Sequence, residues 1–260
     1  MKAIILAAGR GTRLYPYTHD KPKCLLDIGN ISILEHQINL IRDCGINEVV
    51  IVVGFGFERV EDFLRNYDGL GMRINTLYNP FYQSTNSLVS LWIARSEFDE
   101  DLVVMNGDDV YEIGVLDKAL AVRDEKICLP IKKRSRYERE DMKVVVNNSR
   151  ITKISKEISN AETSAESVGI RVFRDTGVEL LKRAVEEEMR NPGAEGKWYI
   201  SSIHRLISKG YKIKPLDIGE LYWMDVDCPL DLFRARKQAD RFLKKEYRAP
   251  NLLRVVDSSE

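Results

Sequence analysis

The chain has 260 residues, and its 40 lysine and arginine side chains are balanced by 40 aspartates and glutamates, which excludes the basic excess of a general nucleic-acid binder. Four cysteines without a CxxC pair and three scattered histidines argue against a disulfide scaffold or a zinc site. No stretch approaches 18 apolar residues and the first apolar run is too short for a signal peptide, so we expect a cytoplasmic protein without a membrane span.

Short apolar runs alternate with amphipathic segments through the first half of the chain. Residues 2–8 are apolar and bounded by glycine, which predicts a buried strand. Residues 32–45 have helical apolar spacing, with Ser32 suited to cap the helix and Gly45 to end it. The same criteria predict strands at 46–54, 72–79 and 101–109 and helices at 57–67 and 84–98.

The second half is less regular. We expect a helix at 229–248, because Pro229 suits a first helical turn. The other expected elements are strands at 126–133, 142–154, 166–173, 212–218 and 221–227, with helices at 176–191 and 199–210. Without repeats or a linker, one domain over residues 1–245 followed by a polar tail at 246–260 is the simplest division.

The order of these elements predicts the fold class. Apolar strands that alternate with helices indicate an α/β fold, Rossmann-like, with a mostly parallel or mixed sheet and helices on both faces. Ligands of such sheets bind outside the carboxyl ends of the strands. The loop after residues 2–8 and the polar residues at 106–109 both lie at such ends.

Residues 6–14, LAAGRGTRL, place glycines and arginines directly after the first strand. Glycines let backbone N–H groups approach phosphate oxygens, and cations neutralise them. The dinucleotide fingerprint GxGxxG fails at Leu14, which disfavours a dehydrogenase, and the P-loop pattern is absent. Glycine spacing alone leaves a phosphate-binding loop and a tight turn with solvated arginines as equal alternatives.

Together with the pair Pro22-Lys23, this loop resembles the LAAGxGTRL…PK signature of nucleotidyltransferases that activate sugar phosphates and phosphocholine-like alcohols. The chain is similar to the same family at 103–109 and 222–232, so the resemblance spans roughly residues 1–240. It implies a fold of the nucleotide-diphospho-sugar transferase type. It also implies attack of a phosphate monoester on the α-phosphorus of a nucleoside triphosphate, with release of pyrophosphate.

By this resemblance, Arg13 faces the β- and γ-phosphates and Lys23 neutralises the α-phosphate region. Arg10 remains open between such a role and a solvated arginine. Asn86 and Ser90 are four residues apart, so one helical face can present both to a base or ribose. The implied nucleotide-binding residues of the loop are Leu6, Ala7, Ala8, Gly9, Gly11 and Thr12.

The implied cofactor is Mg²⁺, which prefers carboxylate oxygens. Asp108 lies where the family has its first metal-binding aspartate, whereas Asp109 in an extended segment points to the opposite side. Asp225 and Asp227 are two residues apart and can face the same side of a strand. Both remain candidates for the second ligand.

For the acceptor, the resemblance points to Lys156 and to Glu166 and Gly169 on the acceptor-lining strand, with Lys197 as a further candidate. Both lysines can equally be surface residues. Trp92 fits core packing better than a cage for a quaternary ammonium group. Such a cage has other candidates in Trp198, Tyr199, Tyr222 and Trp223.

The segment 79–95 lacks the glycines of sugar-type members and resembles the branch that acts on phosphocholine and related phosphoalcohols with CTP. The leading expectation is therefore a magnesium-dependent cytidylyltransferase. A sugar-1-phosphate nucleotidyltransferase using UTP, dTTP or GTP is the first alternative, and a non-catalytic nucleotide-binding regulator is the second. The expected partners are a nucleoside triphosphate and a phosphorylated small acceptor, with no nucleic acid; a homo-oligomer is compatible with the sequence.

Overall fold

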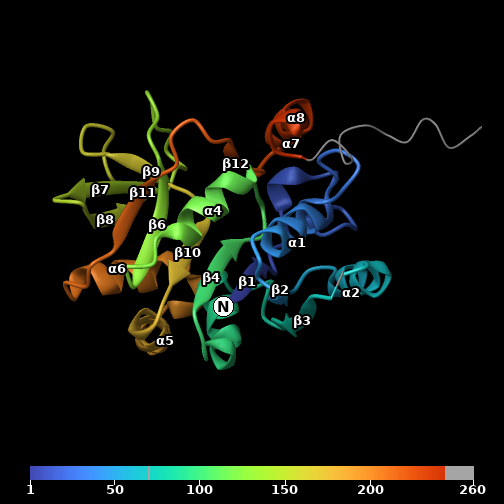
Figure 1. The fold of residues 1–260 in the computed structure, drawn as a ribbon. Helices are drawn as coiled ribbons and strands as arrows, with labels where there is room; N and C mark the ends of the chain where they lie inside the picture. Colours follow the sequence, from blue (N-terminus) through green and yellow to red (C-terminus); the bar gives the residue numbers. More distant parts are fainter. Residues whose placement is uncertain (70, 244–260) are drawn as a thin grey trace, which may run out of the picture.

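The computed structural model describes residues 1–69 and 71–243, and Figure 1 shows their arrangement. The strands are β1 (Lys2–Ala7), β2 (Glu48–Val53), β3 (Arg73–Tyr78), β4 (Leu102–Asn106), β5 (Asp109–Tyr111), β6 (Ile127–Lys132), β7 (Lys143–Asn147), β8 (Arg150–Ser155), β9 (Ala165–Ser167), β10 (Ile170–Phe173), β11 (Lys214–Asp217) and β12 (Trp223–Asp225). The helices are α1 (Ile33–Asp43), α2 (Phe57–Asn66), α3 (Ser87–Ile93), α4 (Ile113–Ala121), α5 (Thr176–Met189), α6 (Ile200–Ser208), α7 (Pro229–Lys237) and α8 (Ala239–Phe242), with 3₁₀ helices at Thr12–Leu14, Lys23–Leu25, Ala94–Glu97 and Ala194–Gly196.

One ten-stranded sheet forms the frame of the molecule. Its order is β3-β2-β1-β4-β10-β6-β9-β7-β8, with β11 paired to β6. Strands β1 to β4 pair in parallel, whereas β10 is antiparallel to both β4 and β6. The predicted mixed, mostly parallel α/β fold is confirmed, and β12 and β5 add a separate two-stranded ribbon.

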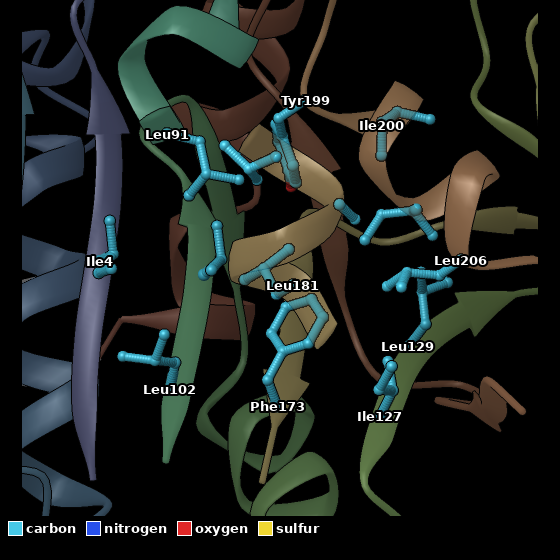
Figure 2. Packing of buried hydrophobic residues seen from close by; sticks show 14 of the residues in the cluster. Ile4, Leu91, Leu102, Ile127, Leu129, Phe173, Leu181, Tyr199, Ile200 and Leu206 are labelled. Carbon is cyan, nitrogen blue, oxygen red and sulfur yellow. The ribbon is translucent and has the colours of Figure 1, made fainter. Parts of the chain in front are cut away.

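Helices cover both faces of the sheet because side chains alternate along each strand. In β1, Ile4 points into a core cluster with α3, α5 and α6, whereas Ile5 points into a second cluster with α1, α2 and α4. Figure 2 shows the first cluster, where Leu91 of α3 and Leu181 of α5 lie over the strands that carry Leu102 and Phe173. The two faces are therefore closed, which leaves the strand ends for a ligand.

The first helix shows how local signals set an element. Ser32 adopts extended dihedrals and its side chain accepts a hydrogen bond from Glu35 N at 3.1 Å, which satisfies one free N–H of the first turn. Gly45 follows the helix with φ +80°. The structure therefore has Ser32 as the helix cap and Gly45 just after the helix end, as predicted.

The structure differs from the prediction in several elements. Some predicted elements are divided, and one helix was not predicted. The predicted strand at 101–109 ends at Asn106, and β5 after it pairs with β12. The predicted strand at 166–173 is divided into β9 and β10. The predicted helix at 84–98 begins only at Ser87. Helix α4 was not predicted. The predicted helix at 229–248 breaks into α7 and α8 at Gln238, and its last residues and the predicted tail at 246–260 lie outside the described residues. In the described part of the chain, every helix is too short or too polar to traverse a bilayer.

Candidate active site

A cavity of about 410 Å³ opens at the carboxyl ends of β1 and β4. This is where ligands bind in parallel α/β sheets. Its walls come from the loop after β1, the start of α3, the loop after β4, β9, β12 and the segment before α6. The predicted site residues that line it are Leu6, Ala7, Ala8, Gly9, Gly11, Thr12, Arg13, Lys23, Asn86, Ser90, Asp108, Lys156, Glu166, Asp225 and Asp227.

The glycine-rich turn folds back on the segment that carries Lys23. Gly11 has φ +62°, and a Cβ there would lie 3.1 Å from Lys23 Cβ, so the turn requires glycine. The Thr18 hydroxyl donates to Gly11 O at 2.8 Å. Leu14, the residue that breaks the dinucleotide fingerprint, is fully buried in a third core cluster with α7 and α8. The loop is thereby anchored at the edge of the cavity.

Lys23 forms the centre of a charged cluster. Its Nζ donates to Asp108 Oδ2 at 2.8 Å and to Asp227 Oδ1 at 2.6 Å. Arg13 Nη2 lies 2.8 Å from the other oxygen of Asp227. Burial opposes the charge of Lys23, but Asp108 and Asp227 outweigh it and raise the lysine pKa, so Lys23 stays charged at any working pH. Burial likewise opposes the charge of Asp227, but Lys23 and Arg13 lower its pKa.

Asp225 faces the same cavity without such compensation. Asp225 is exposed to the cavity, but the surrounding protein removes part of the water around its carboxylate, and this desolvation, followed by repulsion from Asp227 and Asp108, raises its pKa to about 6. Next to it in the ribbon, Asp109 is fully buried, and neither of its carboxylate oxygens has a hydrogen-bond partner. Burial and then Asp108 and Asp225 raise the pKa of Asp109 well above its usual range. Four aspartates thus line this part of the cavity, and of these four only Asp108 and Asp227 form ion pairs with other described residues.

This arrangement fits a magnesium ion that is held jointly with phosphates. Val226 N donates to Asp108 O at 2.9 Å, which brings Asp225 of β12 and Asp227 just after it beside Asp108. No group of three or more His, Cys, Asp or Glu side chains within the described ranges forms a metal site by itself. Mg²⁺ in phosphate-handling sites commonly takes only one or two carboxylates. The side chains that fit are Asp108 and Asp225.

The nucleotide side of the cavity differs in detail from the prediction. Asn86 caps α3 instead of lying within it, and its side-chain oxygen accepts from Ser87 N at 2.8 Å. Ser90 is buried and accepts from Asn79 Nδ2 at 3.1 Å. Trp92 packs against the first core cluster, as the core interpretation predicts. Asn86 and Ser90 border the cavity, but they do not present two free groups on one helical face.

At the other end of the cavity, two carboxylates are each paired with a cation that lies over a tryptophan ring. Lys156 Nζ is 3.0 Å from Glu140 Oε2 and 4.6 Å from the centre of the Trp198 ring. Glu166 pairs with Arg134, whose guanidinium lies 5.4 Å from the centre of the Trp223 ring. Burial raises the pKa of Glu166 to about 7 despite that partner.

The aromatic candidates divide between the cavity and the rest of the molecule. Trp198, Tyr199 and Trp223 line the cavity, whereas Tyr222 stacks on Phe242 of α8, with 5.3 Å between ring centres. All three of these cavity-lining rings already lie against a cation of the chain: Lys156 at Trp198, Arg134 at Trp223 and Arg171 at Tyr199.

Two predicted acceptor residues do not line the cavity. Lys197 pairs with Glu188 of α5 at 2.9 Å, because the segment before α6 packs on that helix. Gly169 lies between β9 and β10, where a Cβ would fall 1.4 Å from Asp109 Oδ2. Its small size makes room for a buried carboxyl group, not for an acceptor. The structure therefore does not bring either residue to the cavity wall.

This contact gives a stability prediction. Gly169→Ala is expected to lower the free energy of unfolding by about 1–3 kcal/mol, because Asp109 is buried and has no space to move away. Urea denaturation measures the change. Gly196→Ala is the matched control, since nothing lies within 4 Å of its Cβ position. Equal stability of the two variants would contradict the packing argument.

Four polar residues that line the cavity form a hydrogen-bonded cluster that was not predicted. Asn106, Ser167, Arg171 and Tyr199 are linked by hydrogen bonds and line the cavity. One signal was present: Arg171 interrupts the apolar strand IRVF, and a cation there is unusual for a central strand.

The family assignment follows from comparison with known proteins. The sequence model of the family described as "Nucleotidyl transferase" matches residues 2–241, almost the whole described chain. The chain belongs to this family.

Within the nucleotidyl transferase family, the chain is 29% identical to the CTP:phosphoglutamine cytidylyltransferase of Campylobacter jejuni, over 89% of this chain and 98% of that protein. It is 28% identical to the CMP-5'-(3-aminopropyl)phosphonate synthase of Streptomyces rubellomurinus, over 92% of this chain but only 38% of that longer protein. The solved structure of the CTP:phosphocholine cytidylyltransferase from Streptococcus pneumoniae superposes with a TM-score of 0.74 at 20% identity, covering 92% of this chain and 98% of that one. The resemblance to the phosphocholine and sugar-phosphate nucleotidyltransferases is confirmed.

Proposed function

We propose that this protein is a nucleotidyltransferase that moves a nucleoside monophosphate from a nucleoside triphosphate to a phosphorylated small acceptor. The observation that carries the proposal is the cluster of Lys23, Asp108 and Asp227 beside the glycine-rich loop. It supplies a buried cation and metal-type ligands at one point of a cavity that both substrates can share. Membership of the nucleotidyl transferase family supports the same reaction.

In this reaction an oxygen of the acceptor phosphate attacks the α-phosphorus. The new P–O bond forms, the bond from the α-phosphorus to the bridging oxygen breaks, and the electron pair leaves with pyrophosphate. The second pKa of a phosphate monoester is about 6, so the nucleophile is already ionised at neutral pH and needs no general base. The protein has to position two anions and neutralise their charge. Lys23, Gly9 and Gly11 line the cavity, and they are the groups that we propose for this task.

We infer that Asp108 and Asp225 hold Mg²⁺, which when bound supplies charge neutralisation at the phosphate oxygens. Asp227 is the weaker candidate, because Lys23 and Arg13 engage one of its oxygens each. The role that fits Asp227 is to orient these two cations toward the triphosphate. Asp225 keeps its carboxylate open to the cavity, and among the described residues no cation forms an ion pair with it.

Arg13 is expected to contribute less than Lys23, since its side chain is 58% exposed and solvent screens its charge. Arg13→Ala should raise the KM for the nucleotide by about tenfold, the range of one lost charge-assisted hydrogen bond. Steady-state kinetics with the nucleotide varied would measure this. An unchanged KM would place Arg13 outside the triphosphate site.

CTP and a phosphoalcohol or amine-bearing acceptor are the substrates we propose. The glycine-free segment 79–95 and the cytidylyl products named for the two relatives support the nucleotide. The acceptor end has Glu140 and Glu166 beside the rings of Trp198 and Trp223, where Lys156 and Arg134 now pair with the carboxylates and lie over the rings. An ammonium group such as that of phosphocholine would take the place of these cations. A sugar 1-phosphate with UTP, dTTP or GTP remains the second candidate, because Glu140 and Glu166 can also accept hydrogen bonds from sugar hydroxyls.

A substrate panel tests this proposal. Pyrophosphate release would be followed with Mg²⁺ and each of CTP, UTP, dTTP and GTP against phosphocholine, inositol phosphate and glucose 1-phosphate. Release with CTP and an alcohol phosphate supports the proposal, whereas release with another nucleotide and glucose 1-phosphate keeps the reaction but rejects the substrates. Nucleotide binding without release from any pair would favour the non-catalytic regulator.

A further inference from the structure

Four cations line the cavity, and three of them pair with carboxylates. Arg13 and Lys23 pair with Asp227, and Lys156 pairs with Glu140. Arg171 is the fourth. It is 2% exposed, and within the described residues its guanidinium donates only to neutral oxygens.

The guanidinium of Arg171 is held in place from two sides. Its Nη2 donates to Ser167 Oγ at 2.9 Å, and its Nη1 lies 3.5 Å from Asn106 Oδ1. The ring of Tyr199, which Figure 2 shows among the buried residues, lies 5.0 Å from the guanidinium carbon, and its hydroxyl donates to the same Asn106 oxygen at 3.0 Å. Among residues 1–69 and 71–243, Nε of Arg171 has no hydrogen-bond partner. The group is therefore oriented but not satisfied.

A buried cation without a counter-ion is costly. Asp109 interacts electrostatically with Arg171, but among the described residues neither Asp109 oxygen accepts a hydrogen bond. The unused donor and the unpaired charge of Arg171 match an anion that enters the cavity. Arginine suits a phosphate in particular, because its planar group presents paired donors.

The order of strands in the sheet places this anion. β1 leads into the phosphate loop, β4 beside it leads to Asp108, and β10 beside β4 carries Arg171. Beyond β10 lie β6 and β9, and β9 carries Glu166 of the acceptor end. Adjacent strands are about 4.8 Å apart, so Arg171 lies one strand past the predicted metal ligand, on the side away from the triphosphate loop.

We propose that Arg171 binds the phosphate group of the acceptor and positions its oxygen for attack on the α-phosphorus. This inference rests on the proposed function for the identity of the acceptor. The arginine takes no proton and forms no covalent bond. It holds a phosphate dianion against the metal side of the cavity, while Asn106, Ser167 and Tyr199 fix its own orientation.

Isothermal titration calorimetry tests the subsite without turnover. Inorganic phosphate is titrated, with Mg²⁺, into protein saturated with whichever α,β-methylene analogue of CTP, UTP, dTTP or GTP binds most tightly, so that the loop is filled. The proteins are wild type, Arg171→Met and Arg171→Lys. Arg95→Met is the matched control, because its guanidinium also lies over an aromatic ring, 3.8 Å from the centre of Trp92, but outside the cavity.

The expected result is a loss of phosphate affinity of at least about tenfold in Arg171→Met, a smaller loss in Arg171→Lys and none in Arg95→Met. Circular dichroism melting identifies any variant that fails to fold; if Arg171→Met does not fold, the Lys variant decides. A folded Arg171 variant with wild-type affinity overturns the proposal, and so does a wild-type protein that binds no phosphate.

The outcomes separate this inference from the proposed function. Phosphate binding that depends on Arg171, without pyrophosphate release from any substrate pair, rejects the enzyme but keeps the anion subsite. If no analogue binds, the proposed function is contradicted and the phosphate titration is run on the protein alone. Once an acceptor is known, Arg171→Met should raise its KM by at least about tenfold, and Arg171→Lys by less, while both leave the KM for the nucleotide unchanged; a shift in both KM values would indicate a merely structural arginine.

Discussion

Lys23→Ala is expected to lower the turnover number by about 10² to 10³, the range seen when one preorganised electrostatic group is removed. Lys23 is the only cation in the described cavity wall that touches both Asp108 and Asp227. Its side chain is 12% exposed, so solvent cannot replace the lost charge. The departing pyrophosphate and the α-phosphate would then face Asp108 without its cation, and Asp227 with only Arg13 as partner. Steady-state pyrophosphate release at saturating substrates measures the effect.

Lys21→Ala is the control for this variant. It lies two residues earlier, pairs with Asp27 at 2.9 Å and is not part of the cavity wall. It should retain the wild-type turnover number, and melting curves would verify that both variants fold. A Lys23→Ala enzyme with near-normal turnover would refute the charge-stabilising role.

Asp108→Asn is expected to abolish magnesium-dependent turnover while the fold persists. Asparagine keeps the shape of the side chain but removes the negative charge that a hard divalent cation requires. The substitution also frees one contact of Lys23, whose second carboxylate, Asp227, remains. The measurement is turnover across a magnesium titration, with Asp62→Asn on the exposed face of α2 as control.

Asp225→Asn and Asp227→Asn are expected to differ from Asp108→Asn in their effect on turnover. Asp225→Asn should shift the magnesium dependence to higher concentrations, whereas Asp227→Asn should act mainly on the nucleotide, through Arg13 and Lys23. Magnesium dependence that persists unchanged in Asp108→Asn would mean that the wrong aspartate has been assigned.

The sheet and the nucleotide side of the site were predictable because their signals are local. The strand at 2–8, its glycine turn and the Pro22-Lys23 pair lie close together in the sequence, and the parallel pairing of β1 and β4 then brings Asp108 beside them. Helix α4 has no such signal. Glu112 provides no side-chain cap, and Gly114 lies in the first turn, where a Cβ would fall 3.1 Å from Leu221 Cδ2.

The acceptor side was less predictable because its contacts join distant segments. Position 169 requires glycine because of Asp109, sixty residues earlier. Lys197 forms an ion pair with Glu188 of α5 and does not line the cavity. Arg171 looks like an exception in an apolar strand until the sheet places it between Asp108 and Glu166. Such neighbours are set by tertiary structure and leave no spacing pattern.

The most direct test of nucleotidyl transfer is the fate of a labelled α-phosphate. The protein would be incubated with Mg²⁺, CTP carrying ³²P at the α-position and phosphocholine, and the products would be separated. We predict label in a cytidine diphosphate-linked product, formed in the same molar amount as unlabelled pyrophosphate. With Asp108→Asn in place of the wild type, we predict neither the labelled product nor pyrophosphate. Label that stays in CTP or appears only as CMP, across all nucleotide and acceptor pairs tested, would contradict it.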